Sequence, residues 1–107
     1  MAEPPEIRSK LARLAQRFIA RTRDELGTLK QHLGRAHDGD AQSLTEVRNL
    51  AHRMHGTGAT LGFTELAEKA ARLEELAETT PADFAAMSAC LEDMEQLLGS
   101  AGAPGRS

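Results

Sequence analysis

The sequence contains no tryptophan and no tyrosine, and aromatic residues make up only 3% of its 107 positions. A chain of this length folds as one domain, whose core must be built from leucine, alanine, methionine, isoleucine and three phenylalanines. Such a core suits helices. Few side chains are available for stacking on bases, and the formal net charge is −3. Both features argue against a nucleic acid or an anionic membrane as a partner.

Cysteine is also scarce, since Cys90 is the single example. One thiol excludes a disulfide within the chain and a cysteine-based metal cluster, and it fits a reducing compartment. No stretch approaches the roughly 18 apolar residues that span a bilayer. The segment M-A-E-P-P-E has neither a basic region nor a hydrophobic run. We therefore expect a cytoplasmic protein.

Apolar residues recur at helical spacing in four segments of the chain. The first predicted helix is long, from about residue 5 to residue 33, and its first two turns are expected to overhang the others. Gly34 is predicted to end it, with the loop G-R-A-H-D-G-D following. The second helix can start at Asp40 or at Ser43, which forms a capping box with Glu46.

The remaining helix boundaries also have sequence signals. Leu61-Gly62 is predicted to end the second helix, Thr64 to cap the third, and Thr80 with Pro81 to start the fourth. Four amphipathic helices with short loops predict an all-α fold, an up-down-up-down antiparallel four-helix bundle over residues 1–98. The tail at 99–107 has nothing to bury and is expected to be disordered.

The stretch from Ser43 to Gly62 has features that helix formation does not require. On a helical projection His52 stands opposite the apolar stripe, on the solvent face with His55 and Gly56 nearby. A glycine costs about 1 kcal/mol relative to alanine in a helix interior, and no packing offsets that cost at Gly56. Its missing side chain would open the approach to His52 for a docking protein. Gly58 instead faces the core, where it would admit another helix.

The run A-H-R-M-H-G-T-G-A-T-L-G resembles the signature of histidine-containing phosphotransfer (HPt) domains of two-component phosphorelays. The resemblance continues into the following helix. The clear departure is His55, where the family usually has lysine. The matching positions are Ala51, His52, Gly56, Leu61, Gly62, Leu66, Ala70, Leu73 and Glu74.

The resemblance implies that His52 accepts a phosphoryl group from a receiver domain's aspartyl phosphate or a hybrid sensor histidine kinase, and passes it to a response-regulator receiver. It implies that Glu74 hydrogen-bonds Nδ1 of His52, and that Mg²⁺ comes with the receiver, so this chain needs no cofactor. A neutral imidazole is a competent nucleophile. Arg48 and Arg53 either steer toward a receiver's acidic pocket or are ordinary solvated charges, and Glu74 is alternatively one more carboxylate of an acidic helix.

No kinase-type nucleotide site is visible, so we expect a monomeric relay intermediate and not an enzyme. His52 and His55 share a helix face, but two exposed ligands are too few for a metal site, and none is expected. The rival hypothesis is a helical adaptor that keeps the HPt shape and regulates a signalling partner by binding alone. The missing lysine favours this rival, whereas the presence of His52 and Gly56 opposes it.

Overall fold

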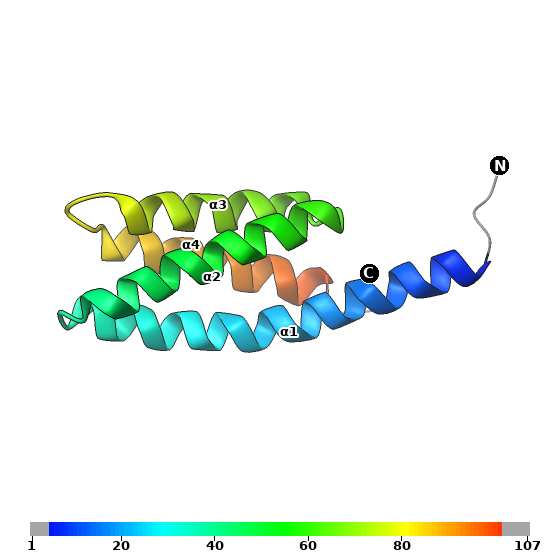
Figure 1. The fold of residues 1–107 in the computed structure, drawn as a ribbon, viewed down its shortest axis with the longest axis horizontal. Coiled ribbons are helices and arrows are strands. Elements are labelled where there is room, and N and C mark those ends of the chain that lie inside the picture. Colours follow the sequence, from blue (N-terminus) through cyan, green and yellow to red (C-terminus); the bar gives the residue numbers. More distant parts are fainter. Residues whose placement is uncertain (1–4, 102–107) are drawn as a thin grey trace.

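The computed structural model describes residues 5–101, and these form four helices joined by short loops. The helices alternate in direction, and each packs on its neighbours in sequence while α1 and α4 close the ring (Figure 1). The predicted all-α, up-down-up-down antiparallel four-helix bundle is confirmed. None of these helices is long and apolar enough to cross a membrane. The helices are α1 (Pro5–His37), α2 (Ala41–Thr60), α3 (Thr64–Glu78) and α4 (Phe84–Ala101).

All four helices contribute aliphatic side chains to one core. Leu29 of α1, Leu73 of α3 and Met87 of α4 are fully buried, and Met54 of α2 is 2% exposed. Burying a side chain of this size contributes about 1.5–3 kcal/mol relative to leaving it exposed. The apolar stripes read from the sequence therefore hold α2 and α3 in place against the other two helices.

The end of α1 differs from the prediction. Gly34 lies inside the helix, which continues to His37, and the chain reverses at Gly39 with a φ of +106°. The amide of Gly39 donates to the carbonyl of Ala36 at 3.0 Å. The prediction of Gly34 as the cap was wrong because an exposed glycine can continue a helix. The left-handed conformation that ends α1 occurs at Gly39 and not at Gly34.

The two candidate starts of α2 are resolved in favour of Asp40. Its Oδ1 accepts the amides of Gln42 and Ser43 at 3.1 and 3.3 Å, and its Oδ2 accepts the Ser43 hydroxyl at 2.9 Å. These hydrogen bonds, that of the hydroxyl first, hold the pKa of Asp40 below its ordinary value. Ser43 is therefore a buried residue within the helix and not its cap.

The start of α3 lies one residue before the predicted cap. Phe63 is the N-cap residue, because its carbonyl already accepts the amide of Ala67 at 2.9 Å. Thr64 is the first helical residue, and no side chain caps the helix. The Phe63 ring packs on Phe18 of α1 with ring centroids 4.9 Å apart. Apolar packing thus fixes this helix start in place of a hydroxyl cap.

The start of α4 lies after the predicted Thr80–Pro81 position. The helix begins at Phe84, and the Asp83 carboxylate accepts the amide of Ala86 at 3.0 Å. Aspartate is among the strongest N-cap residues, and here it reaches a first-turn amide. The predicted start was therefore wrong by a few residues, although the helix itself is present.

The described chain extends past the compact part of the bundle at its N-terminal end. The N-terminal part of α1 overhangs the other helices, as predicted (Figure 1). Ile7 and Leu11 are 47% exposed there, and Leu14 is 41% exposed. At the other end α4 continues to Ala101, so residues 99–101 of the predicted tail are helical. Residues 102–107 lie outside the described part.

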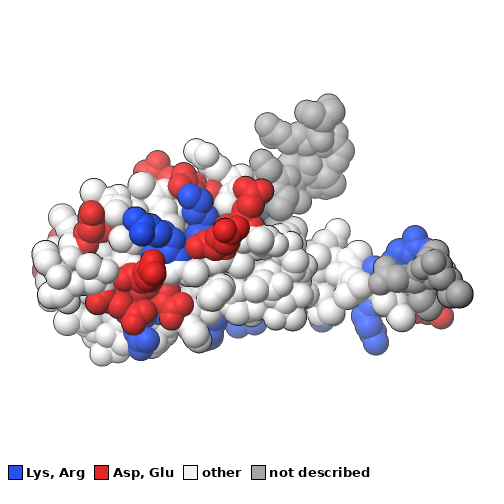
Figure 2. Space-filling model, turned by 90° about the horizontal axis from the view of Figure 1, so that it is seen from above, with Lys and Arg blue, Asp and Glu red and all other residues white. Residues whose placement is uncertain are grey.

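Charge is unevenly distributed along the molecule. Between Ile7 and Arg23 the sequence has six cationic residues and no acidic one, although the whole chain has a net charge of −3. In Figure 2 blue side chains project from the overhanging end of α1, at right, and red side chains gather on the bundle, at left. The overhang is therefore a basic extension of an acidic body.

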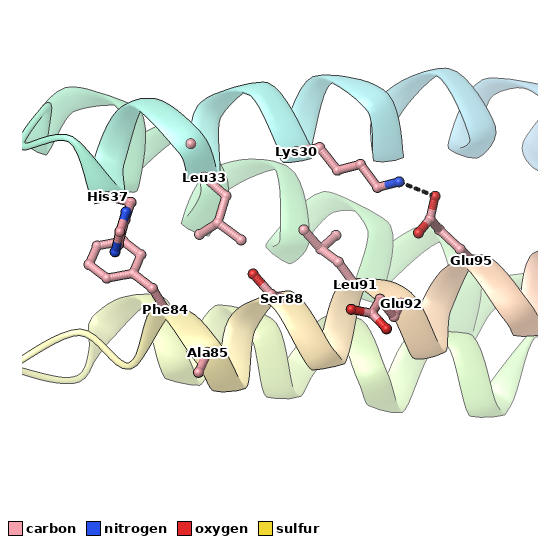
Figure 3. Close-up of a pocket in the computed structure, with 10 residues that line it drawn as sticks. Lys30, Leu33, His37, Phe84, Ala85, Ser88, Leu91, Glu92 and Glu95 are labelled. Carbon is pink, nitrogen blue, oxygen red and sulfur yellow. Dashed lines mark ion pairs between the residues drawn. The ribbon is translucent and has the colours of Figure 1, made fainter.

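A hollow between α1 and α4 lies apart from the predicted site. Lys30 of α1 forms an ion pair with Glu95 of α4, and the rings of His37 and Phe84 meet edge-on with centroids 5.0 Å apart (Figure 3). Leu33 lines the hollow between these contacts. None of the site residues predicted from the sequence lies along it.

Gly58 allows α2 and α3 to approach closely. A Cβ at this position would lie 3.5 Å from Cβ of Ala67 on α3 and 3.5 Å from Cζ of Phe18 on α1. These are ordinary van der Waals distances, so the space admits a methyl group but nothing larger. The prediction that Gly58 faces the core and admits another helix is confirmed.

Gly58→Leu is expected to destabilise the fold by about 1–3 kcal/mol, because the added atoms overpack the contact between α2 and α3. Gly56→Leu is the matched control on the same helix. No atom lies within 4 Å of a Cβ there, so this variant should gain up to about 1 kcal/mol of helix propensity. Urea unfolding measures both. Equal stabilities of the two variants would contradict the close approach at Gly58.

Candidate functional site

His52 stands on the solvent side of α2, with 68% of its side chain exposed. Its backbone is anchored by the core, since Ala51 is fully buried and Met54 is 2% exposed. The imidazole is therefore presented from a fixed position on the exposed face of α2. A partner as large as a folded domain can reach it without entering a pocket.

Glu74 of α3 holds one nitrogen of the His52 ring. Its Oε2 lies 2.9 Å from Nδ1 of His52, and its side chain is only 19% exposed. An ionised carboxylate can only accept hydrogen bonds, so Nδ1 carries the proton and donates it. In the neutral ring this arrangement leaves the lone pair on Nε2. The contact expected from the resemblance is present.

Gly56 lies one turn after His52 and leaves the adjoining surface free of side-chain atoms. It is exposed, and no atom lies within 4 Å of the position that a Cβ would occupy. Its carbonyl accepts the hydroxyl of Thr60 at 3.0 Å within the same helix. The predicted open approach beside the imidazole is thus found in the structure.

A groove of about 630 Å³ adjoins His52 between α1 and α2. Leu14 and Phe18 of α1 give it an apolar part, and Arg21 and Glu25 give it a charged rim. The groove is open to solvent along its length, which suits a surface on a protein partner better than a small molecule. The site therefore includes residues of α1, whereas the sequence predicted residues of α2 and α3 alone.

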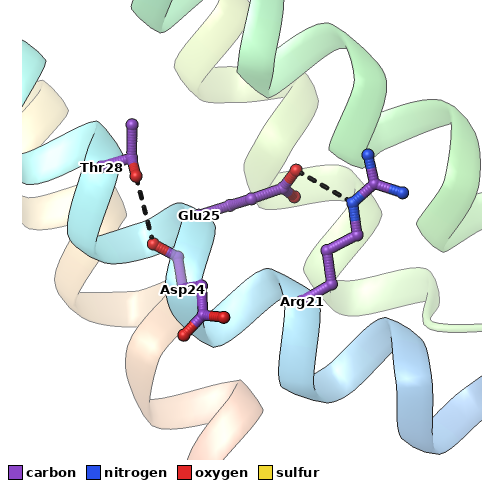
Figure 4. Close-up of polar contacts among 4 residues, drawn as sticks. All are labelled: Arg21, Asp24, Glu25 and Thr28. Atoms are coloured by element: carbon purple, nitrogen blue, oxygen red, sulfur yellow. Dashed lines mark hydrogen bonds and ion pairs between the residues drawn. The ribbon is translucent and has the colours of Figure 1, made fainter.

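Arg21 and Glu25 form an ion pair at the rim of this groove (Figure 4). Nε of Arg21 donates to Oε2 of Glu25 at 3.3 Å, with the two side chains 72% and 21% exposed. Such an exposed pair contributes at most about 1 kcal/mol. The Arg21 guanidinium can therefore leave Glu25 and bind an anionic group of a partner with little loss of free energy.

The four α1 residues of the groove could not be assigned from the sequence. They lie far from His52 along the chain, and only the helical period of α1 hinted that Leu14 and Phe18 share a face. That period does not tell which part of α1 lies beside His52. The antiparallel register of α1 and α2 supplies this information, and only the fold shows it.

The other predicted residues fall on different parts of the site. Arg53 lines the groove together with Gly56. Arg48 and His55 do not line it, and Arg48 donates to Oδ1 of Asn49 at 3.0 Å. His55 is only partly exposed, in contrast to the solvent-facing position expected. The structure thus brings Arg53 and Gly56 to the groove and leaves Arg48 and His55 outside it.

The site offers a limited set of chemical groups. It has one nucleophilic ring nitrogen, one carboxylate that orients the ring, and nearby cationic side chains. Among residues 5–101, no three His, Cys, Asp or Glu side chains gather closely enough to hold a metal ion. The arrangement suits the transfer of an electrophilic group that a partner brings and removes.

A family model described as Hpt domain matches residues 13–103. No curated protein and no solved structure matches the chain. The matched range contains His52, Gly56 and Glu74, and it spans parts of all four helices.

The hydrogen bond from His52 to Glu74 predicts the tautomer of the ring. Glu74→Leu should release Nδ1, so that the neutral ring populates both tautomers, whereas Glu74→Gln retains an oxygen that can accept. The ¹⁵N chemical shifts of the ring nitrogens report the difference. Identical ring spectra for wild type and Glu74→Leu would show that the carboxylate does not orient the ring.

Proposed function

The chain belongs to the Hpt domain family, whose members are phosphotransfer modules of phosphorelays without a kinase domain of their own, and from this premise we propose that His52 is the phosphoacceptor. One observation carries the proposal. The ring is 68% exposed while its Nδ1 is held by Glu74 at 2.9 Å. This combination leaves a single nucleophilic nitrogen, Nε2, in reach of a docked partner.

The donor in this proposal is an aspartyl phosphate on a receiver domain, either free or within a hybrid sensor histidine kinase. Nε2 of His52 attacks the phosphorus, so a P–N bond forms while the P–O bond breaks and the aspartate leaves as a carboxylate. The ring gains a positive charge, which the Glu74 carboxylate at Nδ1 stabilises. In the return step an aspartate of a response-regulator receiver attacks the phosphorus, and Nε2 leaves with its electron pair.

Neither direction requires a proton to enter or leave the site. This balance fits a site that has an orienting carboxylate but no separate general acid or base. Phosphoryl transfer passes through a loose transition state, for which positioning and charge stabilisation supply most of the catalysis. Mg²⁺ bound in the receiver would neutralise phosphoryl oxygens, so this chain needs no cofactor of its own.

We infer that the receiver docks over Gly56 and the groove between α1 and α2. A side chain at residue 56 would stand between the partner and the imidazole, and none is present there. Phe18 gives the docking area an apolar part, while Arg21 and Arg53 supply positive charge opposite an acidic receiver pocket. From the composition we place this exchange in the cytoplasm, and we propose that the chain acts as a monomer.

His52→Gln is expected to abolish phosphoryl acceptance and to leave the melting temperature nearly unchanged, because an exposed side chain contributes little to the core. The assay incubates the chain with ³²P-labelled receiver domains and tests for an acid-labile, base-stable label on it. His55→Gln is the matched control and should keep the label. If His52→Gln still becomes labelled, the phosphoacceptor is another residue. If no receiver labels the wild-type chain, the result favours the rival hypothesis of an adaptor that acts by binding alone.

A further inference from the structure

The overhanging part of α1, Pro5–Arg17, is termed here the α1 arm. Its large apolar residues Ile7, Leu11 and Leu14 are 47%, 47% and 41% exposed, and their spacing puts them on one stripe. Scattered exposed apolar residues are ordinary on protein surfaces, but a contiguous stripe marks an interaction surface. The family match begins at residue 13, so most of the α1 arm lies outside the matched range.

The stripe of the α1 arm continues into the groove beside His52. Leu14 belongs to both, since it is the last member of the exposed stripe and also lines the groove. Arg21 lines the groove as well. Lys10 and Arg17 lie eleven and four residues before Arg21, which are close to whole numbers of helical turns. Lys10, Arg17 and Arg21 therefore lie on the same side of the apolar stripe. The apolar and the cationic parts of the groove therefore extend together along the α1 arm.

The charge of the α1 arm limits which partner can cover the stripe. The arm has one acidic residue, Glu6, and four cationic residues, Arg8, Lys10, Arg13 and Arg17. A second copy meeting this stripe with its own would bring two basic segments together, which is unfavourable. A partner with an acidic surface beside an apolar patch is complementary to it.

We propose that the α1 arm is a second docking surface for the receiver domain that exchanges phosphoryl groups with His52. The receiver contacts Ile7 and Leu11 with an apolar patch, and Lys10 and Arg17 with acidic residues near its phosphorylated aspartate. This inference rests on the proposed function of His52. Because most of the α1 arm lies outside the family match, it serves to select among receivers and leaves the chemistry to α2 and α3.

The dimensions allow one domain to cover both surfaces. Arg21 lines the groove beside His52, and Leu11 lies ten residues away on the same helix, or about 15 Å along its axis. A domain of 100–150 residues has a radius of gyration of about 13–15 Å and is on the order of 35 Å across. A receiver centred over the groove at Arg21 therefore reaches Leu11 and Lys10.

The test uses the full chain and the phosphorylated receiver that labels wild-type His52 fastest. Arg17→Glu should slow transfer about threefold to tenfold at subsaturating receiver and leave the rate at saturation unchanged, because the charge acts on association. Its matched control is Arg23→Glu, the same substitution on the opposite side of α1, which should be near wild type. The difference between Arg17→Glu and wild type should shrink in high salt.

A second pair of variants tests the apolar part of the α1 arm. Leu11→Gln should raise the receiver concentration that gives half-maximal transfer a few-fold, with Ala12→Gln on the opposite side as its control. If Arg17→Glu and Leu11→Gln both match their controls while wild-type His52 is labelled normally, the α1 arm does not dock the receiver, and the proposed function stands. If no receiver labels the wild type, the proposed function fails and the docking surface fails with it.

Two further results would overturn the inference by assigning the stripe another occupant. In the first, Leu11→Gln converts a dimer to a monomer in sedimentation, with transfer unchanged, which would assign the stripe to a second copy. In the second, the wild type sediments with phosphatidylglycerol vesicles and both arm variants do not, again with transfer unchanged. That result would assign it to an anionic membrane.

Discussion

The close contact of α2 with α3 at Gly58 sets the register on which the site depends. Gly58 faces Ala67, with a Cβ at residue 58 only 3.5 Å from that of Ala67. The helices are antiparallel, so six residues back along α2 and seven forward along α3 run about 9 Å and about 10.5 Å in the same direction. Those steps lead to His52 and Glu74. The hydrogen bond of 2.9 Å between them is therefore a consequence of how the two helices meet at the glycine.

In the proposed function, the surface around His52 separates chemistry from recognition. Chemistry needs only the oriented ring and its carboxylate, which α2 and α3 supply from a buried core. Recognition is proposed to fall to α1, whose stripe and cations run from the groove to the overhang. Substitutions in α1 can then change the choice of receiver without moving His52 or Glu74. A relay module that must discriminate among similar receivers would benefit from such a division.

The sequence was informative wherever a single helix determines the outcome. The period of α2 placed His52 opposite the core, and the two glycines differed in exposure as their positions on the helix predicted. Boundaries were less certain, because competing signals lie within a few residues of each other. Gly34 and Thr80 were plausible ends, but Gly39 and Asp83 make the hydrogen bonds. The groove was not predictable, since Leu14 and Arg21 meet His52 only through the register of α1 against α2.

The central claim is that the hydrogen bond from Nδ1 of His52 to Glu74 leaves Nε2 as the atom that binds the phosphoryl group. Its most direct test is NMR of the ¹⁵N-labelled chain after phosphorylation by a receiver, in which coupling between phosphorus and nitrogen identifies the bonded atom. Phosphorus on Nε2 of His52, with a proton on Nδ1, is the expected result. Phosphorus on Nδ1 of His52, or on any other residue, would contradict the claim.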